Sequence, residues 1–272
     1  MFRTHIVLNK DFIQGCKPET ISSLINEGKR LVACSEFYVE VTTMAESHPP
    51  CRRRAHVVSE IGICESCARI RLARLRKLHG HSDSIDVLDP VGTLFRYEID
   101  NQRPCTPLAE RFFHGQFNPN FRFVFSEAHD RLIQGERNHL EIEWPMQYDQ
   151  VILEILRACP RLTQQDLQRK EVILEVYSRL RSSRLPPAEL LDEGWAIYRR
   201  VQVDLFAALD YRHSLVNGEI TIQPDRKAHN QTDLIICLVG ALVGAVATDE
   251  KFIMRCFKVI CPEGQIVPVL AS

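Results

Sequence analysis

The chain has 272 residues, enough for one large domain or two small ones, and its apolar (45%) and charged (25%) fractions are ordinary for a globular protein. A net charge of -1 gives no overall sign of nucleic-acid or membrane binding. The N-terminus lacks the apolar core and the cleavage site of a signal peptide. The ten cysteines are therefore expected to be reduced thiols in a cytoplasmic protein. The longest apolar run, between Asp233 and Asp249, is shorter than the roughly 20 residues that a membrane-spanning helix needs.

The N-terminal segment predicts a buried strand that ends close to an acid. HIVL (5–8) is a continuous apolar run, which is typical of a buried parallel strand. The run ends at Asn9, and Asp11 follows two residues later. An acid is therefore expected just beyond the carboxyl end of the first strand.

A helix, a second strand and a second helix are expected next. PETISSLINEG (18–28) has apolar residues on one helical face and stops at Gly28. KRLVACS (29–35) predicts another short strand, whose Ser35 can cap a helix through EFYVEVTTMAE. This arrangement places Glu40 within the first turns of that helix.

The stretch 51–81 is locally basic in a near-neutral chain. Its cationic residues are Arg52, Arg53, Arg54, Arg69, Arg71, Arg74, Arg76 and Lys77. Such an excess can bind a phosphate backbone, and an amphipathic helix with a solvated basic face is the alternative. Both interpretations can hold together.

Three cysteines lie in the same stretch. Cys64 and Cys67 have a C-x₂-C spacing that suits zinc, with Cys51 upstream. A structural zinc site needs four ligands, usually with a second close pair, and the stretch has only one pair. Ordinary cysteines on a helix, or a redox pair, are the alternatives.

The remainder of the middle, up to residue 218, is mixed and then helical. TLFRYEI (93–99) and NFRFVF (120–125) alternate apolar and polar residues and predict paired strands. Amphipathic helical patterns follow at 148–159, 163–183 and 186–215, the last opened by prolines. Their apolar stripes are more typical of a core than of a ligand site. Residues 48–218 are therefore interpreted as a largely helical insertion.

The C-terminal segment predicts a helix that returns as a strand. Asn230 or Thr232 can cap a helix beginning near Asp233, and GAVAT (244–248) predicts a buried strand that Asp249 follows. Ten helical residues and five strand residues each span roughly 15 Å. Both aspartates should then reach the sheet edge outside the carboxyl ends of the strands, where α/β proteins bind ligands.

Together, Asp11, Glu40, Asp233 and Asp249 are expected at one rim. Acids so close repel and raise each other's pKa, and a divalent cation removes that penalty. Hard oxygen ligands suit Mg²⁺ or Mn²⁺, which can activate water and neutralise a phosphate. The chemistry indicated is phosphodiester hydrolysis.

Each of these residues also has a purely structural interpretation. The acids after the strands can be turn residues, and Asp233 can be an acid in the first turn of a helix that favours its dipole. Glu40 can be solvated, with Glu36 or Glu46 as the ligand instead. Lys227 and His229, just before the rim, can contact a substrate phosphate or be loop residues without a role.

The segments HIVLNKDF, CSEFYVEV, NQTDLIICLVGAL and AVATDEKF, in this order, resemble the PIN-like ribonucleases. The resemblance covers about the first 46 and last 45 residues. It implies a parallel α/β sandwich built from residues 1–47 and 219–272. It also implies metal-dependent RNA cleavage, with the four acids of the rim as catalytic and metal-holding residues.

The chain departs from the family pattern in two places. Asn9 stands where the family has its first Asp, and Thr248 stands at the Asn position of its last turn. The function predicted is a cytoplasmic Mg²⁺- or Mn²⁺-dependent endoribonuclease; the alternative is a module that binds RNA or a protein without cleavage. Possible partners are single-stranded RNA, a protein inhibitor and a second copy of the chain, and no membrane is expected.

Overall fold

A computed structural model describes residues 5–15, 20, 23–24, 26–32, 95, 98–105, 144–180 and 185–269. Several predictions lie outside the described residues: those for Glu40, for the basic stretch 51–81 with its cysteines, and for the strand at 120–125. Within the described ranges, no helix is long and apolar enough to cross a membrane.

Four parallel strands form one sheet in the order β2-β1-β5-β6. They are β1 (His5–Leu8), β2 (Arg30–Val32), β5 (Ala245–Ala247) and β6 (Gln265–Val267). Leu8 at the end of β1 pairs with Ala247 at the end of β5. All residues of β1 and β5 are buried, which explains their unbroken apolar runs. The predicted strands at 5–8, 29–35 and 244–248 are confirmed in their described residues, as is the α/β class with a parallel sheet.

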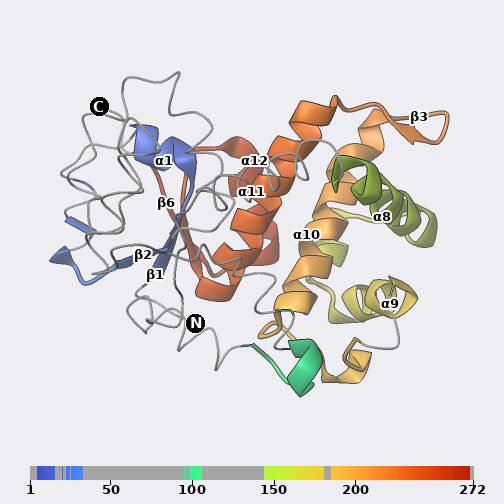
Figure 1. The fold of residues 1–272 in the computed structure, drawn as a ribbon, viewed down its shortest axis with the longest axis horizontal. Coiled ribbons are helices and arrows are strands. Elements are labelled where there is room, and N and C mark those ends of the chain that lie inside the picture. The colour runs from blue at the N-terminus through green and yellow to red at the C-terminus, as the bar shows by residue number, and fades with distance from the viewer. Residues whose placement is uncertain are drawn as a thin grey trace, which may run out of the picture.

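The helices are stacked on this sheet in layers. Those whose bounds the structure gives are α1 (Lys10–Gly15), α8 (Trp144–Ala158), η3 (Gln164–Gln168), α9 (Lys170–Leu180), η4 (Ala188–Leu190), α10 (Ala196–Tyr211), η5 (Arg212–Ser214), α11 (Pro224–Val243) and α12 (Lys251–Ile260). Helices α11 and α12 lie between the sheet and α10, with α8 and α9 on the far side of α10 (Figure 1). A small antiparallel hairpin, β3 (Leu215–Val216) and β4 (Glu219–Ile220), precedes α11.

Helix α11 is longer than predicted. It begins at Pro224, whose fixed φ suits the first position of a helix, and ends at Gly244, whose φ of 92° is left-handed. The predicted start near Asp233 is therefore wrong, because Asp233 lies in the middle of the helix. The expected caps Asn230 and Thr232 are buried within it. Nothing between the proline and the glycine interrupts the helix.

The predicted strand at 93–99 is also wrong, because Phe95 and Glu98 are helical. The fully buried Glu98 carboxylate accepts hydrogen bonds from the N–H groups of Ala196 (2.6 Å) and Ile197 (3.0 Å). These are the first two residues of α10, whose N–H groups have no partner within the helix. Glu98 therefore caps α10 from a distant segment, and α10 begins there rather than at the prolines near residue 186.

One hydrophobic core joins the described helices and the sheet. It contains Val7 of β1 and Val246 of β5 together with Tyr148 of α8 and Trp195 beside α10. The central helices thus share a core with the C-terminal helices α11 and α12. The division into a domain from both chain ends and an insertion at 48–218 stays a prediction.

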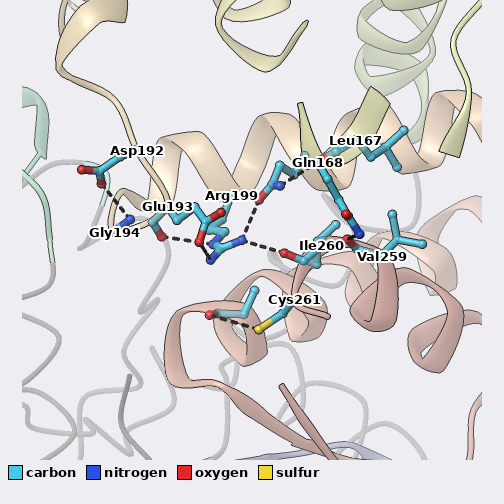
Figure 2. A network of polar contacts seen from close by, with 11 residues as sticks. Leu167, Gln168, Asp192, Glu193, Gly194, Arg199, Val259, Ile260 and Cys261 are labelled. Atoms are coloured by element: carbon cyan, nitrogen blue, oxygen red, sulfur yellow. Dashed lines mark hydrogen bonds and ion pairs between the residues drawn. The ribbon is translucent and has the colours of Figure 1, made fainter. Parts of the chain in front are cut away.

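A buried polar network fixes the far end of α12, as Figure 2 shows. Arg199 of α10 is 5% exposed and donates to the carbonyl of Ile260 (2.7 Å), while Gln168 of η3 donates to the carbonyl of Val259 (3.0 Å). Carbonyls in the last turn of a helix lack partners within it, so these side chains complete α12. The start of α12, two residues after Asp249, is thereby positioned by the central helices.

We predict that Glu98→Ala lowers the free energy of unfolding by about 2–4 kcal/mol, because buried N–H groups of α10 lose their acceptor. Urea unfolding followed by circular dichroism measures the change. Glu171→Ala, at an exposed position of α9, is the matched control and should change stability by less than about 0.5 kcal/mol. Equal effects in the two variants would show that Glu98 is not a cap.

Candidate functional site at the carboxyl edge of the sheet

Asp11 connects the ends of β1 and β5. It lies in the first turn of α1, just after β1. Its carboxylate accepts a hydrogen bond from the Thr248 hydroxyl (3.0 and 3.1 Å to its two oxygens) and another from the N–H of Asp249. Thr248 and Asp249 directly follow β5. Residues from opposite ends of the chain therefore meet at the carboxyl edge of the sheet.

The Thr248 hydroxyl determines which of its neighbours must donate a hydrogen bond and which must accept one. It is buried, donates to Asp11, and accepts from the Asn9 amide (3.3 Å) and from the N–H of Glu250 (2.9 Å). A hydroxyl has one proton and two acceptor sites, so donation to Asp11 leaves only acceptor sites for residue 9. An amide fits there, whereas a carboxylate would face an acceptor. Asn9 and Asp11 are thus a matched pair around Thr248.

The Asn9 side chain also has a free acceptor. Its Oδ1 atom is buried and makes no hydrogen bond to any other described residue. A buried oxygen without a partner costs free energy, so its presence beside the acids is notable. It is a neutral oxygen of the kind that a hard cation accepts.

The Asp249 side chain is directed toward the chain after β6. It is exposed, and its Oδ1 atom accepts a hydrogen bond from the N–H of Val269 (3.0 Å). Asp11 therefore contacts the backbone of Asp249, while the Asp249 carboxylate holds the segment beyond β6. The two residues are brought together through the turn and not through a direct carboxylate pair.

Asp233 is 1% exposed on the face of α11 that meets β5 and α12. On this face, Cys237 donates to the carbonyl of Ile253 in α12 (3.6 Å), and a Cβ at Gly240 would lie 3.5 Å from Val246 of β5. Asp233 and Asp249 each lie roughly 16 Å from Gly244, along the helix and along the strand. By these lengths, Asp233 lies at about the level of Asp249, just beyond the carboxyl end of β5.

Lys227 and His229, which were expected just before the rim, lie within α11. Lys227 is buried, with its Nζ atom bound to Asp149 of α8 (2.5 Å) and to the carbonyl of Ile220 (3.3 Å). Lys227 thus stabilises the fold and is not a phosphate contact. His229 is 46% exposed, with its Nε2 atom 3.7 Å from Asp233 Oδ2. His229 is accessible beside the buried acid.

The described residues at this edge have the types of ligand atom that a divalent cation binds, but they do not form a complete metal site. Asp11, Asp233, Asp249 and Asn9 provide the hard oxygen atoms that Mg²⁺ and Mn²⁺ prefer. Within the described part of the chain, no three His, Cys, Asp or Glu residues are close enough to hold a metal ion. Glu40, the fourth acid of the predicted set, lies outside it.

Comparison with family models, curated proteins and solved structures found no match for the chain. Functional inference therefore depends on the residues at this edge and on the resemblance of the terminal segments. The sequence interpretation missed the role of Thr248, and its only signal was a threonine directly after a buried strand.

We predict that Thr248→Val, which preserves shape, lowers the free energy of unfolding by about 1–3 kcal/mol. The variant leaves the Asp11 carboxylate and the Asn9 amide without their shared partner. Thermal and urea unfolding measure the loss. Thr221→Val, at an exposed threonine that bonds one carbonyl, is the control and should cost less than about 0.5 kcal/mol. A tolerated Thr248→Val would mean that the hydroxyl does not organise the edge.

Burial raises the pKa of Asp11, and hydrogen bonds from the Asp249 backbone and the Thr248 hydroxyl oppose the shift. The folded protein thus binds this proton more tightly than the unfolded chain, whose aspartate has a pKa of 3.8. The stability that protonated Asp11 contributes is fully present below that value and is lost as pH rises through the raised pKa.

We therefore predict that the unfolding free energy of the wild type, relative to Asp11→Asn, falls as pH rises from about 3.8 through this window. Above the window, the difference should become constant. Urea titrations across a pH series measure it. A difference that instead grows with pH would mean that the pKa of Asp11 is lowered in the folded protein.

Proposed function

We propose that the protein is a PIN-like, Mg²⁺- or Mn²⁺-dependent endoribonuclease of the cytoplasm that cleaves RNA at the carboxyl edge of the sheet. The observation that carries this proposal is the contact of Asp11 with Thr248 and the Asp249 backbone. It joins the segments in which the resemblance expects the first and last acids. A parallel sheet covered by α11 and α12 is compatible with the PIN-like sandwich.

The residues of the edge have distinct roles in this proposal. Asp11, Asp233 and Asp249, with Glu40, would hold the cation, which when bound supplies an activated water and neutralises the phosphate. Thr248 orients the Asp11 carboxylate, and the Asn9 oxygen offers a neutral contact. His229, exposed beside Asp233, can donate a hydrogen bond to a phosphate oxygen.

A second candidate is a PIN-like module that binds RNA or a protein partner without cleaving. The observation that favours it is the Asn9–Thr248–Asp11 arrangement. An amide stands where the family has its first acid, and the Asp11 carboxylate already binds the turn after β5. Weaker metal binding at such an edge would leave a binding surface without catalysis.

We predict that the purified protein cleaves single-stranded RNA with Mn²⁺, and that Asp233→Asn and Asp249→Asn each lower the rate by at least about 100-fold. Losing a metal-holding carboxylate should cost at least as much as losing an outer-shell partner, which is worth about 10–100-fold. Gel assays of end-labelled RNA, with and without EDTA, measure the rate.

Asp100→Asn is the matched control, because Asp100 is an exposed aspartate remote in sequence from all four acids. It should retain the wild-type rate. RNA binding without cleavage by the wild type would favour the second candidate. Cleavage that survives both site variants or EDTA would contradict the metal-dependent mechanism.

A further inference from the structure

The solvent face of α12 is entirely basic. The helix has three exposed positions, Lys251, Arg255 and Lys258, and its other residues are buried or half-buried. Positions i, i+4 and i+7 fall on one face of a helix, so the three cations form a single row. We call this row the basic face of α12. It was not singled out by the sequence analysis.

This clustering is not a property of the whole chain. The net charge is -1, so the row is a local excess. The exposed positions of α9 mix signs: Lys170, Glu171, Glu175, Ser178 and Arg179. In α9, Arg179 and Glu175 form an ion pair (2.6 Å), as is usual for a solvated helix face. The basic face of α12 has no acid of its own helix to neutralise it.

Arg255, in the centre of the row, is held in place yet accessible. Its Nη2 atom contacts Asp210 of α10 (3.0 Å), and its guanidinium lies over the rings of Phe206 (6.0 Å) and Phe252 (5.9 Å). The side chain remains 61% exposed. A guanidinium has five N–H donors, so most of them remain available to a phosphate. The acids beside the row are Asp210, which pairs with Arg255, and Asp249 and Glu250, which precede Lys251.

The row starts at the candidate site. Lys251 follows Asp249 and Glu250, and α12 then runs away from the carboxyl edge along the sheet and α11 (Figure 1). Lys251 and Lys258 are about 10 Å apart along the axis of the helix. Successive phosphates of a stacked strand advance about 3.4 Å, so the row spans about three phosphate steps and each of its cations can contact one phosphate.

We propose that the basic face of α12 binds the phosphate backbone of single-stranded RNA and leads it to the carboxyl edge of the sheet. Charge complementarity and the single-file arrangement of the cations favour one strand of phosphates as the occupant. The choice of RNA as the ligand rests on the proposed function. It applies equally to the cleaving and the non-cleaving candidate, because backbone binding needs no metal.

The test is equilibrium binding of labelled single-stranded RNA of about 12 nucleotides in EDTA, by fluorescence anisotropy over a range of salt concentrations. The variant carries Lys251→Gln, Arg255→Gln and Lys258→Gln. Each contact to single-stranded RNA contributes about 0.7 to the slope of log K against log salt. We expect the slope to shrink by about 2 and the affinity at 0.1 M salt to fall by up to about 100-fold.

Two further variants separate the proposal from general effects. Arg157→Gln, Arg161→Gln and Arg179→Gln together remove the same charge from exposed positions on and just after α8 and on α9, helices on the far side of α10, and should leave the slope within about 0.7 of the wild type. Lys251→Arg, Arg255→Lys and Lys258→Arg together keep the row basic and should bind as the wild type does. Loss of binding in this charge-conserving variant would overturn the proposal.

The remaining outcomes are also decisive. No RNA binding by the wild type, or equal weakening by the two charge-removing variants, overturns the proposal. Displacement of the RNA by polyglutamate at equal charge concentration overturns it in favour of an acidic protein partner. RNA binding that depends on the basic face, with no Mn²⁺-dependent cleavage, supports the proposal while contradicting the nuclease function.

Discussion

The hydrogen bond from the Thr248 hydroxyl to Asp11 is the constraint on which the candidate site depends. It joins the turn after β5 to the first turn of α1, and it determines that residue 9 presents a donor to the same hydroxyl. A single proton thereby distinguishes the roles of Asn9 and Asp11. The order of Asn9 and Asp11 is thus structurally self-consistent. An acid lies at the edge two residues after Asn9.

The central helices support this edge from the opposite end of α12. Arg199 and Gln168 hold the last carbonyls of that helix, while its first residues follow the Asp11 contact. Glu98, from a segment still earlier in the chain, caps α10, which carries Arg199. Polar contacts thus extend from the segment at 98–105 through α10 to α12. The middle of the chain therefore contributes to the geometry of the ends.

Strands β1, β2 and β5 could be predicted because buried strands leave short apolar runs, and Gly244 marks the turn into β5, whereas the partly exposed β6 was not predicted. The start of α11 could not, because Lys227 and Asn230 look like loop residues until their partners on α8 and α10 are known. Alternation suggested a strand around Glu98, but the segment is helical and its Glu98 carboxylate caps α10, a contact that no local pattern reveals. The Thr248 contact was equally hidden, because it joins residues more than 200 positions apart.

The most direct test of the account is a crystal soaked in Mn²⁺ and measured at an energy where manganese scatters anomalously. The proposed metal site predicts a peak at the carboxyl edge, about 2.0–2.3 Å from oxygens of Asp11 and of at least one of Asp233 and Asp249. A crystal with saturating Mn²⁺ and no peak at this edge, in which Asp11 contacts only the turn after β5, would contradict it.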